Sequence, residues 1–304
     1  MKQIVILSGK GGAGKTSLSA GLAHLSSISV KEVFPVMVDA DVDAANLSLV
    51  LQPSDGISNE FWGGSIATIN TDLCNNCGKC VQVCRFDAIL SPHTDRPFHG
   101  IDAIACDGCA ACVYACPASA IIMTPQLEGN WFQSNTPYGE LFHAELLPGR
   151  ENSGKLVTLV KQKARLFAHE NQSELLIIDG PPGIGCPVIS ACAGADLGLV
   201  VTEPGVAGIH DLKRVLATLQ HFSIPVVICI NKADIYSEGT RVIYEFAKEQ
   251  SIEVLGEIPY DPAIHQAMGA GQPVTLTLPE SPASLAIINI WLKLMEIFNP
   301  SEQA

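Results

Sequence analysis

The sequence predicts an α/β fold in which a mostly parallel sheet is covered by helices on both faces. Short stretches that are apolar on both faces end in polar, glycine or proline residues at 3–7, 33–41, 174–183, 196–205, 224–234 and 252–261. Between them lie stretches with helical spacing of apolar residues, most clearly at 15–25, 208–222 and 239–250. Strands that are apolar on both sides and alternate with helices indicate a parallel sheet buried between two helical layers.

Composition places the chain among globular proteins. Of its 304 residues, 47% are hydrophobic and 16% are charged, which is enough apolar material for a substantial core. No apolar run approaches the roughly 18 residues of a membrane helix. The first apolar run, residues 4–7, is too short for a signal peptide. We therefore expect a cytoplasmic protein, whose cysteines are kept reduced. A net charge of −13 without any basic run disfavours nucleic acid and membrane surfaces as partners.

The first predicted strand runs into a glycine-rich loop, GKGGAGKT at residues 9–16. This fits the phosphate-loop pattern G-x-x-x-x-G-K-[ST] between a strand and a helix, so the sheet is predicted to be that of a P-loop NTPase. Backbone N–H groups of such a loop surround the phosphates. We expect Lys15 to reach the β- and γ-phosphates and Thr16 to bind Mg²⁺. The predicted nucleotide contacts in the loop are Gly9, Gly11, Gly12, Ala13, Gly14, Lys15, Thr16 and Ser17.

A second lysine in the loop, Lys10, resembles the signature of the deviant Walker A ATPases: the MinD and ParA proteins, the Mrp proteins and the nitrogenase iron protein. The resemblance implies ATP as the nucleotide and a nucleotide-dependent homodimer. It also implies that Lys10 acts on the partner subunit's phosphates, as an arginine finger supplied in trans does. The alternative is a solvated loop lysine.

Aspartates end two of the predicted strands. Residues 38–47, VDADVDAANL, carry Asp39, Asp41 and Asp43, and Asp179 ends the strand LLIID. In the resembled family the second aspartate of D-x-D lies near the attacking water, which selects Asp41 as catalytic together with Lys10 and Lys15. Asp43 matches a switch I aspartate, so the roles of Asp41 and Asp43 are not distinguished by the sequence. For one of the three aspartates, the alternative is that it only belongs to an acidic helix N-terminus. Asp179 matches the Walker B aspartate of the Mg²⁺ shell, and residues 180–183 match switch II.

The family resemblance also predicts the base site. Asn231, in INKAD, ends a strand at the position where related ATPases bind adenine, and Pro259 and Asp261 would flank the base. Asp234 resembles the guanine-reading aspartate of GTPases. The preference for ATP over GTP therefore rests on the family resemblance.

Eight of the eleven cysteines form two runs of the pattern C-x-x-C-x-x-C-x-x-x-C, at residues 74–84 and 106–116. Zinc sites usually pair two C-x-x-C knuckles across a long spacer, and zinc is the alternative here. The doubled run instead resembles the bacterial ferredoxin with two [4Fe–4S] clusters, in which the fourth cysteine of each run ligates the other cluster. The predicted ligand sets are Cys74, Cys77, Cys80 and Cys116 for one cluster, and Cys106, Cys109, Cys112 and Cys84 for the other.

Residues 66–125 break the alternation of strands and helices. We predict that they form a small ferredoxin-like α+β insertion with a strand after each cysteine run, at the tails DAI and SAI. Residues 1–65 and 126–304 would form one discontinuous ATPase domain. Residues 128–154 are expected to supply a return strand and a loop.

Several residues depart from the family patterns or fall outside them. Arg85 stands where ferredoxins have a proline, and it either raises a cluster potential or docks a partner, or is a surface residue. Cys186 has the offset from Asp179 of a bridging-cluster ligand in the nitrogenase iron protein, but no cysteine lies between Cys116 and Cys186 to complete that site. We therefore expect buried thiols at Cys186 and Cys229. The histidines show no metal-ligand spacing.

The leading hypothesis is an ATP-binding and ATP-hydrolysing iron–sulfur protein that couples nucleotide-driven dimer closure to electron transfer through two [4Fe–4S] clusters. Its ATPase would be slow alone and stimulated by a redox or iron–sulfur partner protein. One alternative is an iron–sulfur cluster carrier or assembly ATPase. The other is a MinD-like spatial organiser with structural or sensing clusters, although the tail at 283–304 has one lysine against two glutamates and lacks the basic character of a membrane anchor.

Overall fold

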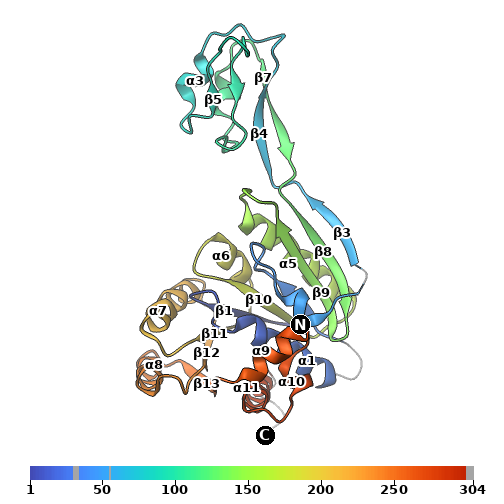
Figure 1. Cartoon of the computed structure of the whole chain (residues 1–304), viewed down its shortest axis with the longest axis vertical. Coiled ribbons are helices and arrows are strands. Elements are labelled where there is room, and N and C mark those ends of the chain that lie inside the picture. The colour runs from blue at the N-terminus through green and yellow to red at the C-terminus, as the bar shows by residue number, and fades with distance from the viewer. Residues whose placement is uncertain (30–33, 55, 299–304) are drawn as a thin grey trace. The chain divides into compact units, whose positions relative to one another are not determined.

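The computed structural model describes residues 1–29, 34–54 and 56–298 (Figure 1). Val33, in the second predicted strand, and residues 299–304 of the predicted terminal helix lie outside the described residues. The chain divides into two compact units. The first unit comprises residues 1–59, 131–145 and 153–304, and the second comprises residues 60–130 and 146–152. The predicted insertion lies within the second unit, and its assignment as a ferredoxin domain stays a prediction.

A nine-stranded sheet forms the centre of the first unit, in the order β13-β12-β11-β1-β10-β2-β9-β8-β3. The strands from β13 to β9 are parallel to their neighbours, which confirms the predicted mostly parallel sheet. Their bounds are β1 (Lys2–Ser8), β2 (Val36–Asp39), β3 (Gly56–Phe61), β8 (Gly129–Thr136), β9 (Gly139–Leu146), β10 (Leu175–Pro182), β11 (Leu197–Thr202), β12 (Val226–Asn231) and β13 (Glu253–Ile258).

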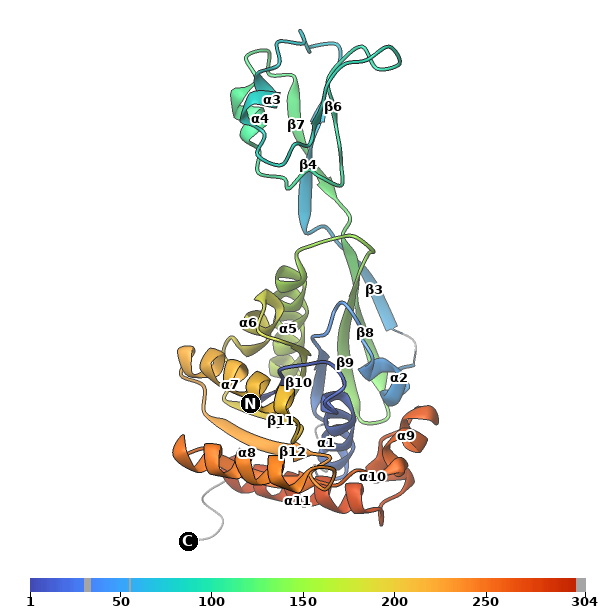
Figure 2. The ribbon, with the colours of Figure 1, turned by 60° about the vertical axis from the view of Figure 1, so that its left-hand side comes forward.

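Helices cover both faces of this sheet (Figure 2). They are α1 (Lys15–Ser29), α2 (Leu47–Leu51), α5 (Ser153–Glu170), α6 (Cys186–Cys192), α7 (Val206–His221), α8 (Ser237–Glu249), α9 (Pro262–Gly269), α10 (Val274–Thr277) and α11 (Pro282–Phe298). Successive side chains of a strand point to opposite faces. Ile4 and Ile6 of β1 accordingly share a core with residues of α1 and α11, while Val5 and Leu7 are equally buried. The continuous apolar runs in the sequence reflect this double burial.

The expected return strand and loop at residues 128–154 is wrong in part, because the segment forms two strands. β8 and β9 are neighbours in the sheet and are joined by the two residues Pro137 and Tyr138. Gly139, which follows the turn, has a φ of 131°, and a Cβ there would lie 2.1 Å from the carbonyl oxygen of Pro35. β9 therefore packs closely beside the start of β2, a contact that no local pattern predicts.

The second unit is built from short elements. β4 (Gly64–Ile69) pairs antiparallel with β7 (Ile121–Gln126), and β5 (Ile89–Leu90) pairs antiparallel with β6 (Gly100–Ile101). Single-turn helices α3 (Lys79–Val83) and α4 (Ala111–Ala115) lie within the two cysteine runs. A small apolar core gathers Ala67, Ile89 and Ile121 around Cys80 and Cys112. A strand thus begins at the last residue of each of the DAI and SAI tails.

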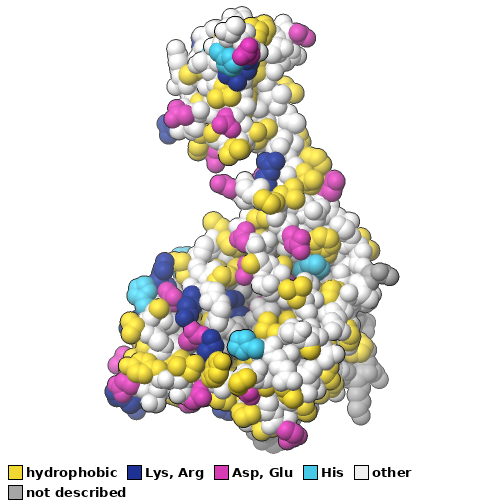
Figure 3. All heavy atoms as spheres, viewed as in Figure 1, with side chains coloured by type: hydrophobic (Ala, Val, Ile, Leu, Met, Phe, Trp, Pro, Cys, Tyr) yellow, Lys and Arg dark blue, Asp and Glu magenta, His cyan; other side chains and the backbone are white. Residues whose placement is uncertain are grey.

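The surface carries its charges in mixed form. On the face drawn in Figure 3, acidic and basic side chains are interspersed over the first unit, without a continuous basic patch. In the part of the chain that the structure describes, no helix has the length and apolar character needed to cross a membrane.

Candidate functional site

The glycine-rich loop lies between the end of β1 and the start of α1. Gly12 and Gly14 have φ angles of 78° and 94°, in the left-handed region that glycine adopts without strain. A Cβ at Gly14 would also lie 2.2 Å from the side-chain nitrogen of Asn231. The backbone therefore curls as a phosphate loop does, and residue 14 has no room for a side chain.

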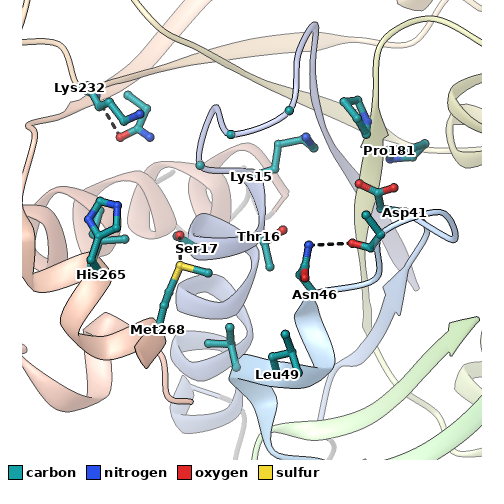
Figure 4. A pocket seen from close by; sticks show the side chains of 18 of the residues that line it. Lys15, Thr16, Ser17, Asp41, Asn46, Leu49, Pro181, Lys232, His265 and Met268 are labelled. Atoms are coloured by element: carbon teal, nitrogen blue, oxygen red, sulfur yellow. Dashed lines mark hydrogen bonds between the residues drawn. The ribbon is translucent and has the colours of Figure 1, made fainter. Parts of the chain in front are cut away.

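A cavity of about 670 Å³ lies beside this loop (Figure 4). That volume falls within the usual range for small-molecule sites. Its walls come from the loop and the start of α1, from α2 and the segment between β2 and α2, from the ends of β10 and β12, from the segment after β13, and from α6 and α9. The predicted site residues that line it are Gly11, Gly12, Gly14, Lys15, Thr16, Ser17, Asp41, Asn231, Pro259 and Asp261. The sheet thus brings together at one edge residues that are more than 200 positions apart in the chain.

Lys15 is held at the cavity by a short chain of hydrogen bonds. Its Nζ donates to Ser8 Oγ at 2.8 Å, and that hydroxyl donates to the carbonyl oxygen of Lys10 at 2.7 Å. Lys15 is only 7% exposed, and burial lowers the pKa of its ammonium group, against the opposing charges of nearby aspartates. A desolvated ammonium group beside the loop gains a strong partner when phosphate enters.

Asp179, within β10, is buried beneath the loop. Its carboxylate accepts hydrogen bonds from Thr16 Oγ1 at 2.7 Å and from Ser19 Oγ at 2.8 Å. Burial raises the pKa of Asp179, while these hydroxyls and the charge of Lys15 act in the opposite direction. The pKa of Asp39 is also raised, first by burial and then by the charge of Asp179.

These groups fit a magnesium ion. Thr16 and Asp179 offer oxygen atoms, the ligands that Mg²⁺ prefers, at the point where a phosphate would supply more. Asp39 and Asp41 add negative charge to the same region, and burial raises the pKa of both carboxyl groups and of Asp179, although Lys15 opposes the shift at Asp41 and Asp179. Additional positive charge would favour the ionised form of these groups. A divalent cation would supply that charge.

The three aspartates at the end of β2 and just after it have different positions. Asp39 is 1% exposed and accepts backbone N–H groups of Asp41, Asn46 and Leu47 at 3.1, 3.0 and 2.9 Å, so it fixes the turn into α2. Asp41 and Asp43 line the cavity, and Figure 4 shows Asp41 beside Pro181, across from Lys15. Burial raises the pKa of Asp41, and Lys15 opposes that shift.

The side chains of Asn231 and Asp261, which are predicted to lie at the base, form hydrogen bonds with backbone groups in this structure. Asn231 donates its side-chain N–H to the carbonyl oxygen of Ala13 at 2.8 Å, and so ties β12 to the phosphate loop. Asp261 caps α9 through the N–H of Ala263 at 2.9 Å and also accepts the N–H of Ala283 at 3.0 Å. A role for these residues at the base stays a prediction.

Lys10 lies in an ion pair within its own chain. Its Nζ is 2.6 Å from one carboxylate oxygen of Glu203, and Lys232 Nζ is 2.5 Å from the other oxygen. Gly9, the preceding residue, packs so closely on Asp211 that a Cβ would lie 2.1 Å from the aspartate Cβ.

Two small cavities in the second unit are each lined by four cysteines. One has Cys74, Cys77, Cys80 and Cys116 in its wall, and the other has Cys84, Cys106, Cys109 and Cys112. Each wall thus combines three cysteines of one run with the last cysteine of the other run. The structure brings together the same fours that the crossed pattern predicts, while their binding of clusters stays a prediction.

Left-handed backbone turns direct the cysteines toward these cavities. Gly78 and Ala110, immediately before α3 and α4, have φ angles of 69° and 61°. At Gly108, with φ of 74°, a Cβ would lie 2.3 Å from the carbonyl oxygen of Ser65. The backbone N–H of Ala120 donates to the sulfur of Cys116 at 3.3 Å. Such turns expose backbone N–H groups to a bound anion.

Four thiols in each cavity are the donor set that a [4Fe–4S] cluster takes. Within residues 1–29, 34–54 and 56–298, no three His, Cys, Asp or Glu side chains are arranged to hold one metal ion. Each set of four thiols lines its cavity, and all eight are free of disulfides.

The expectation of a buried thiol at Cys186 is wrong. Cys186 is exposed because it begins α6 at the surface, directly after Gly185, while Cys192 and Cys229 are buried. Burial raises the pKa of Cys192 to about 11 and that of Cys229 to about 12. Arg85 is exposed, and neither of its predicted roles is tested by this position.

Comparison with known proteins identifies the nucleotide unit. The family described as the CobQ/CobB/MinD/ParA nucleotide binding domain matches residues 4–274. The chain belongs to this family. It is 38% identical to the uncharacterized protein MJ0578 of Methanocaldococcus jannaschii over 85% of this chain and 84% of that protein. It is 28% identical to an iron–sulfur cluster carrier protein of Aquifex aeolicus, over only 41% of this chain and 37% of the carrier.

A solved structure shares the family fold. The septum site-determining protein MinD of Pyrococcus horikoshii, in complex with Mg-ADP, aligns with a TM-score of 0.59 and 18% identity. The alignment covers 100% of this chain and 99% of that one. The family membership shows that this is a nucleotide-binding protein, and ATP and Mg²⁺ are the ligands that the family implies. The cavity beside the phosphate loop is the predicted site for that nucleotide.

Sequence reasoning missed several residues of this family site. Ser8 and Ser19 hold Lys15 and Asp179 but lie outside the eight-residue motif. Met268 lines the cavity and accepts a hydrogen bond from Ser17 at 3.0 Å. Glu203 and Lys232 carried a usable signal, because each directly follows the last residue of a parallel strand, β11 beside β1 and β12 beside β11.

Proposed function

We propose that this protein is an ATP-hydrolysing iron–sulfur protein, in which nucleotide-driven dimer closure is coupled to electron transfer through two [4Fe–4S] clusters. The observation that carries the proposal is the pair of cavities, each lined by three cysteines of one run and the last cysteine of the other. Bound in these cavities, the clusters would supply two one-electron carriers close to each other.

The chain's own residues have defined tasks in this proposal. Cys80 and Cys112 lie in the core of the second unit and anchor the two cysteine sets. The N–H group of Ala120 stabilises thiolate charge on Cys116. Because hydrogen bonds to sulfur shift a cluster's reduction potential, Ala120 also helps to set the potential at that cavity.

The nucleotide site would bind ATP with its phosphates in the loop. Lys15 would contact the β- and γ-phosphates, and Thr16 and Asp179 would hold Mg²⁺ through their adjacent oxygens. Asp41 lines the same cavity and would orient the attacking water. Lys10 would reach the partner subunit's phosphates in a nucleotide-dependent homodimer. Hydrolysis would be slow in the chain alone and faster with a redox or iron–sulfur partner protein.

The chain connectivity supports coupling between the two units. The boundaries of the units fall within β3, β8 and β9 and directly before α5. β3 follows α2 and the segment 41–46, part of which lines the nucleotide cavity. α5 packs on α6, and α6 directly follows residues 180–185. Because β3 crosses a unit boundary and α5 begins directly after another, movements of either segment upon binding of the γ-phosphate would reach the cysteine unit through these chain connections.

Cluster transfer to other proteins is the second candidate, since part of the chain is similar to an iron–sulfur cluster carrier. A cluster shared between subunits needs accessible thiols. Cys186 is exposed but Cys192, six residues later, is buried and faces Lys161. These two thiols are not accessible together in this structure, which argues against a shared cluster at this pair and leaves electron transfer as the function that we propose.

Iron analysis of double cysteine variants tests the crossed ligand sets. The anaerobically purified protein should contain about eight iron atoms, as two [4Fe–4S] clusters require. Cys74→Ala with Cys116→Ala removes ligands from one set and should leave about half the iron. Cys74→Ala with Cys84→Ala damages both sets and should remove most of it. Clusters held within single runs would give the opposite pattern, and stoichiometric zinc without iron would refute the proposal.

A redox titration monitored by EPR tests the coupling. Potentials are measured with and without a non-hydrolysable ATP analogue and Mg²⁺. A shift of about 30 mV in a one-electron potential corresponds to roughly 0.7 kcal/mol of coupling. By reciprocity, reduction would then change the affinity for ATP by the same free energy. Potentials that do not respond to the analogue would remove redox coupling from the proposed function.

A further inference from the structure

Three charged side chains form a row at the carboxyl edge of the sheet. Lys10 follows β1, Glu203 follows β11 and Lys232 follows β12, and these strands are neighbours in the order β12-β11-β1. Because parallel strands end at the same edge, the central glutamate meets both lysines. The two carboxylate oxygens are divided between them, at 2.6 Å from Lys10 and 2.5 Å from Lys232.

The glutamate is the fixed member of this row. Its side chain is 14% exposed, against 42% for Lys10 and 32% for Lys232. Burial alone would raise the pKa of Glu203, but the hydrogen bonds and charges of the two lysines outweigh burial and lower it. Glu203 is therefore a stable carboxylate for which two lysines compete.

We propose that Glu203 is a positioning residue that holds Lys10 within its own chain before the dimer forms and releases it when the dimer closes. The inference rests on the proposed function, in which Lys10 binds the phosphates of the partner subunit. A lysine paired with Glu203 must leave that carboxylate before it binds another anion. Lys232 keeps Glu203 paired after Lys10 has left, so release exposes no unpaired charge.

The arrangement predicts opposite effects on dimerisation for substitutions of Glu203 and Lys232. Glu203→Gln removes the charge that holds Lys10, so ATP-dependent dimerisation should become stronger. Lys232→Met leaves Glu203 with Lys10 alone, so the pair tightens and dimerisation should become weaker. Exposed ion pairs contribute little free energy, so we expect each pair that opens to change the dimerisation constant about threefold. Because two pairs open in each dimer, the dimerisation constant of Glu203→Gln should rise about tenfold.

The experiment is sedimentation velocity of the full-length protein under anaerobic conditions, with a saturating non-hydrolysable ATP analogue and Mg²⁺. Glu238→Gln is the matched control, since Glu238 pairs with Arg241 on the surface of α8 and undergoes the same change of charge. We expect a dimerisation constant close to that of the wild type for this control, a higher dimerisation constant for Glu203→Gln and a lower one for Lys232→Met. Equal or lower dimerisation of Glu203→Gln would overturn the inference.

Two further variants separate this inference from the proposed function. Lys10→Met should abolish analogue-dependent dimerisation, and the Lys10→Met, Glu203→Gln double variant should show no recovery. If Lys10→Met dimerises like wild type, the role of Lys10 in trans fails, and the holding role of Glu203 fails with it. If Lys10→Met is monomeric and Glu203→Gln behaves like wild type, the proposed dimer survives and only the holding role is refuted.

Discussion

Asp261 offers a test that separates a structural role from a role at the nucleotide base. The family resemblance predicts that it flanks the base, yet both of its carboxylate oxygens accept backbone N–H groups. One belongs to Ala263 in the first turn of α9, where Pro262 also fits the helix start, and the other belongs to Ala283 in the first turn of α11. A single side chain thus joins the beginnings of two helices.

The cost of removing this side chain follows from its two bonds. Loss of a helix N-cap costs about 1 kcal/mol. Ala283 is fully buried, and loss of the bond from its N–H to a charged acceptor costs about 1.5–3 kcal/mol. Asp261→Ala should therefore lower the free energy of unfolding by about 2.5–4 kcal/mol. Asp261→Asn keeps one acceptor oxygen and should lose about half as much.

Urea unfolding followed by circular dichroism measures these free energies, with exposed Glu249→Ala as the matched loss of a carboxylate. Calorimetric titration with an ATP analogue and Mg²⁺ measures the affinity of the same variants. Capping predicts a graded loss of stability from wild type through Asn to Ala. If Asp261→Ala is as stable as the control but binds the analogue far more weakly, the capping argument is refuted and the base-site prediction gains support.

Three other predictions concern the sites described above. Gly14→Ala should abolish analogue binding in calorimetry, because the added Cβ collides with Asn231 in a left-handed backbone, and retained binding would contradict the loop geometry. Without nucleotide, stability should fall as the pH rises above about 4, because burial raises the folded-state pKa of Asp179 and Asp39 and the native state then binds more protons than the unfolded state. Urea unfolding at pH 5 and pH 8 checks this, and Asp179→Asn should weaken the dependence. Burial lowers the pKa of Lys161 to about 8, so between pH 8 and about 10.5 the native state has released a proton that the unfolded state keeps. Over this range the stability of the wild type should rise relative to that of Lys161→Met by up to about 3 kcal/mol. A stability difference that does not change with pH would show that Lys161 stays charged.

Patterns among neighbouring residues determined the buried strands, the phosphate loop and the cysteine runs of this protein. Strands buried on both faces, the loop at residues 9–16 and the doubled cysteine runs are each written in consecutive or closely spaced residues. Their consequences are local as well: a phosphate loop curls because Gly12 and Gly14 allow it, and a strand begins at Ile89 and at Ile121 after each cysteine run. Short-range sterics and hydrophobic periodicity suffice for such features.

The tertiary structure decided what these pieces meet. Asp39 turned inward to fix the chain into α2, whereas Asp41, two residues later, lines the cavity, and a strand's D-x-D spacing does not distinguish the two. Cys186 lies at the surface despite its apolar surroundings in the sequence. The strand order placed Glu203 between Lys10 and Lys232, and the fold of the second unit placed Cys116 with the first cysteine run. These contacts join residues far apart in the chain, and their geometry depends on how whole elements pack, which no short window of sequence contains.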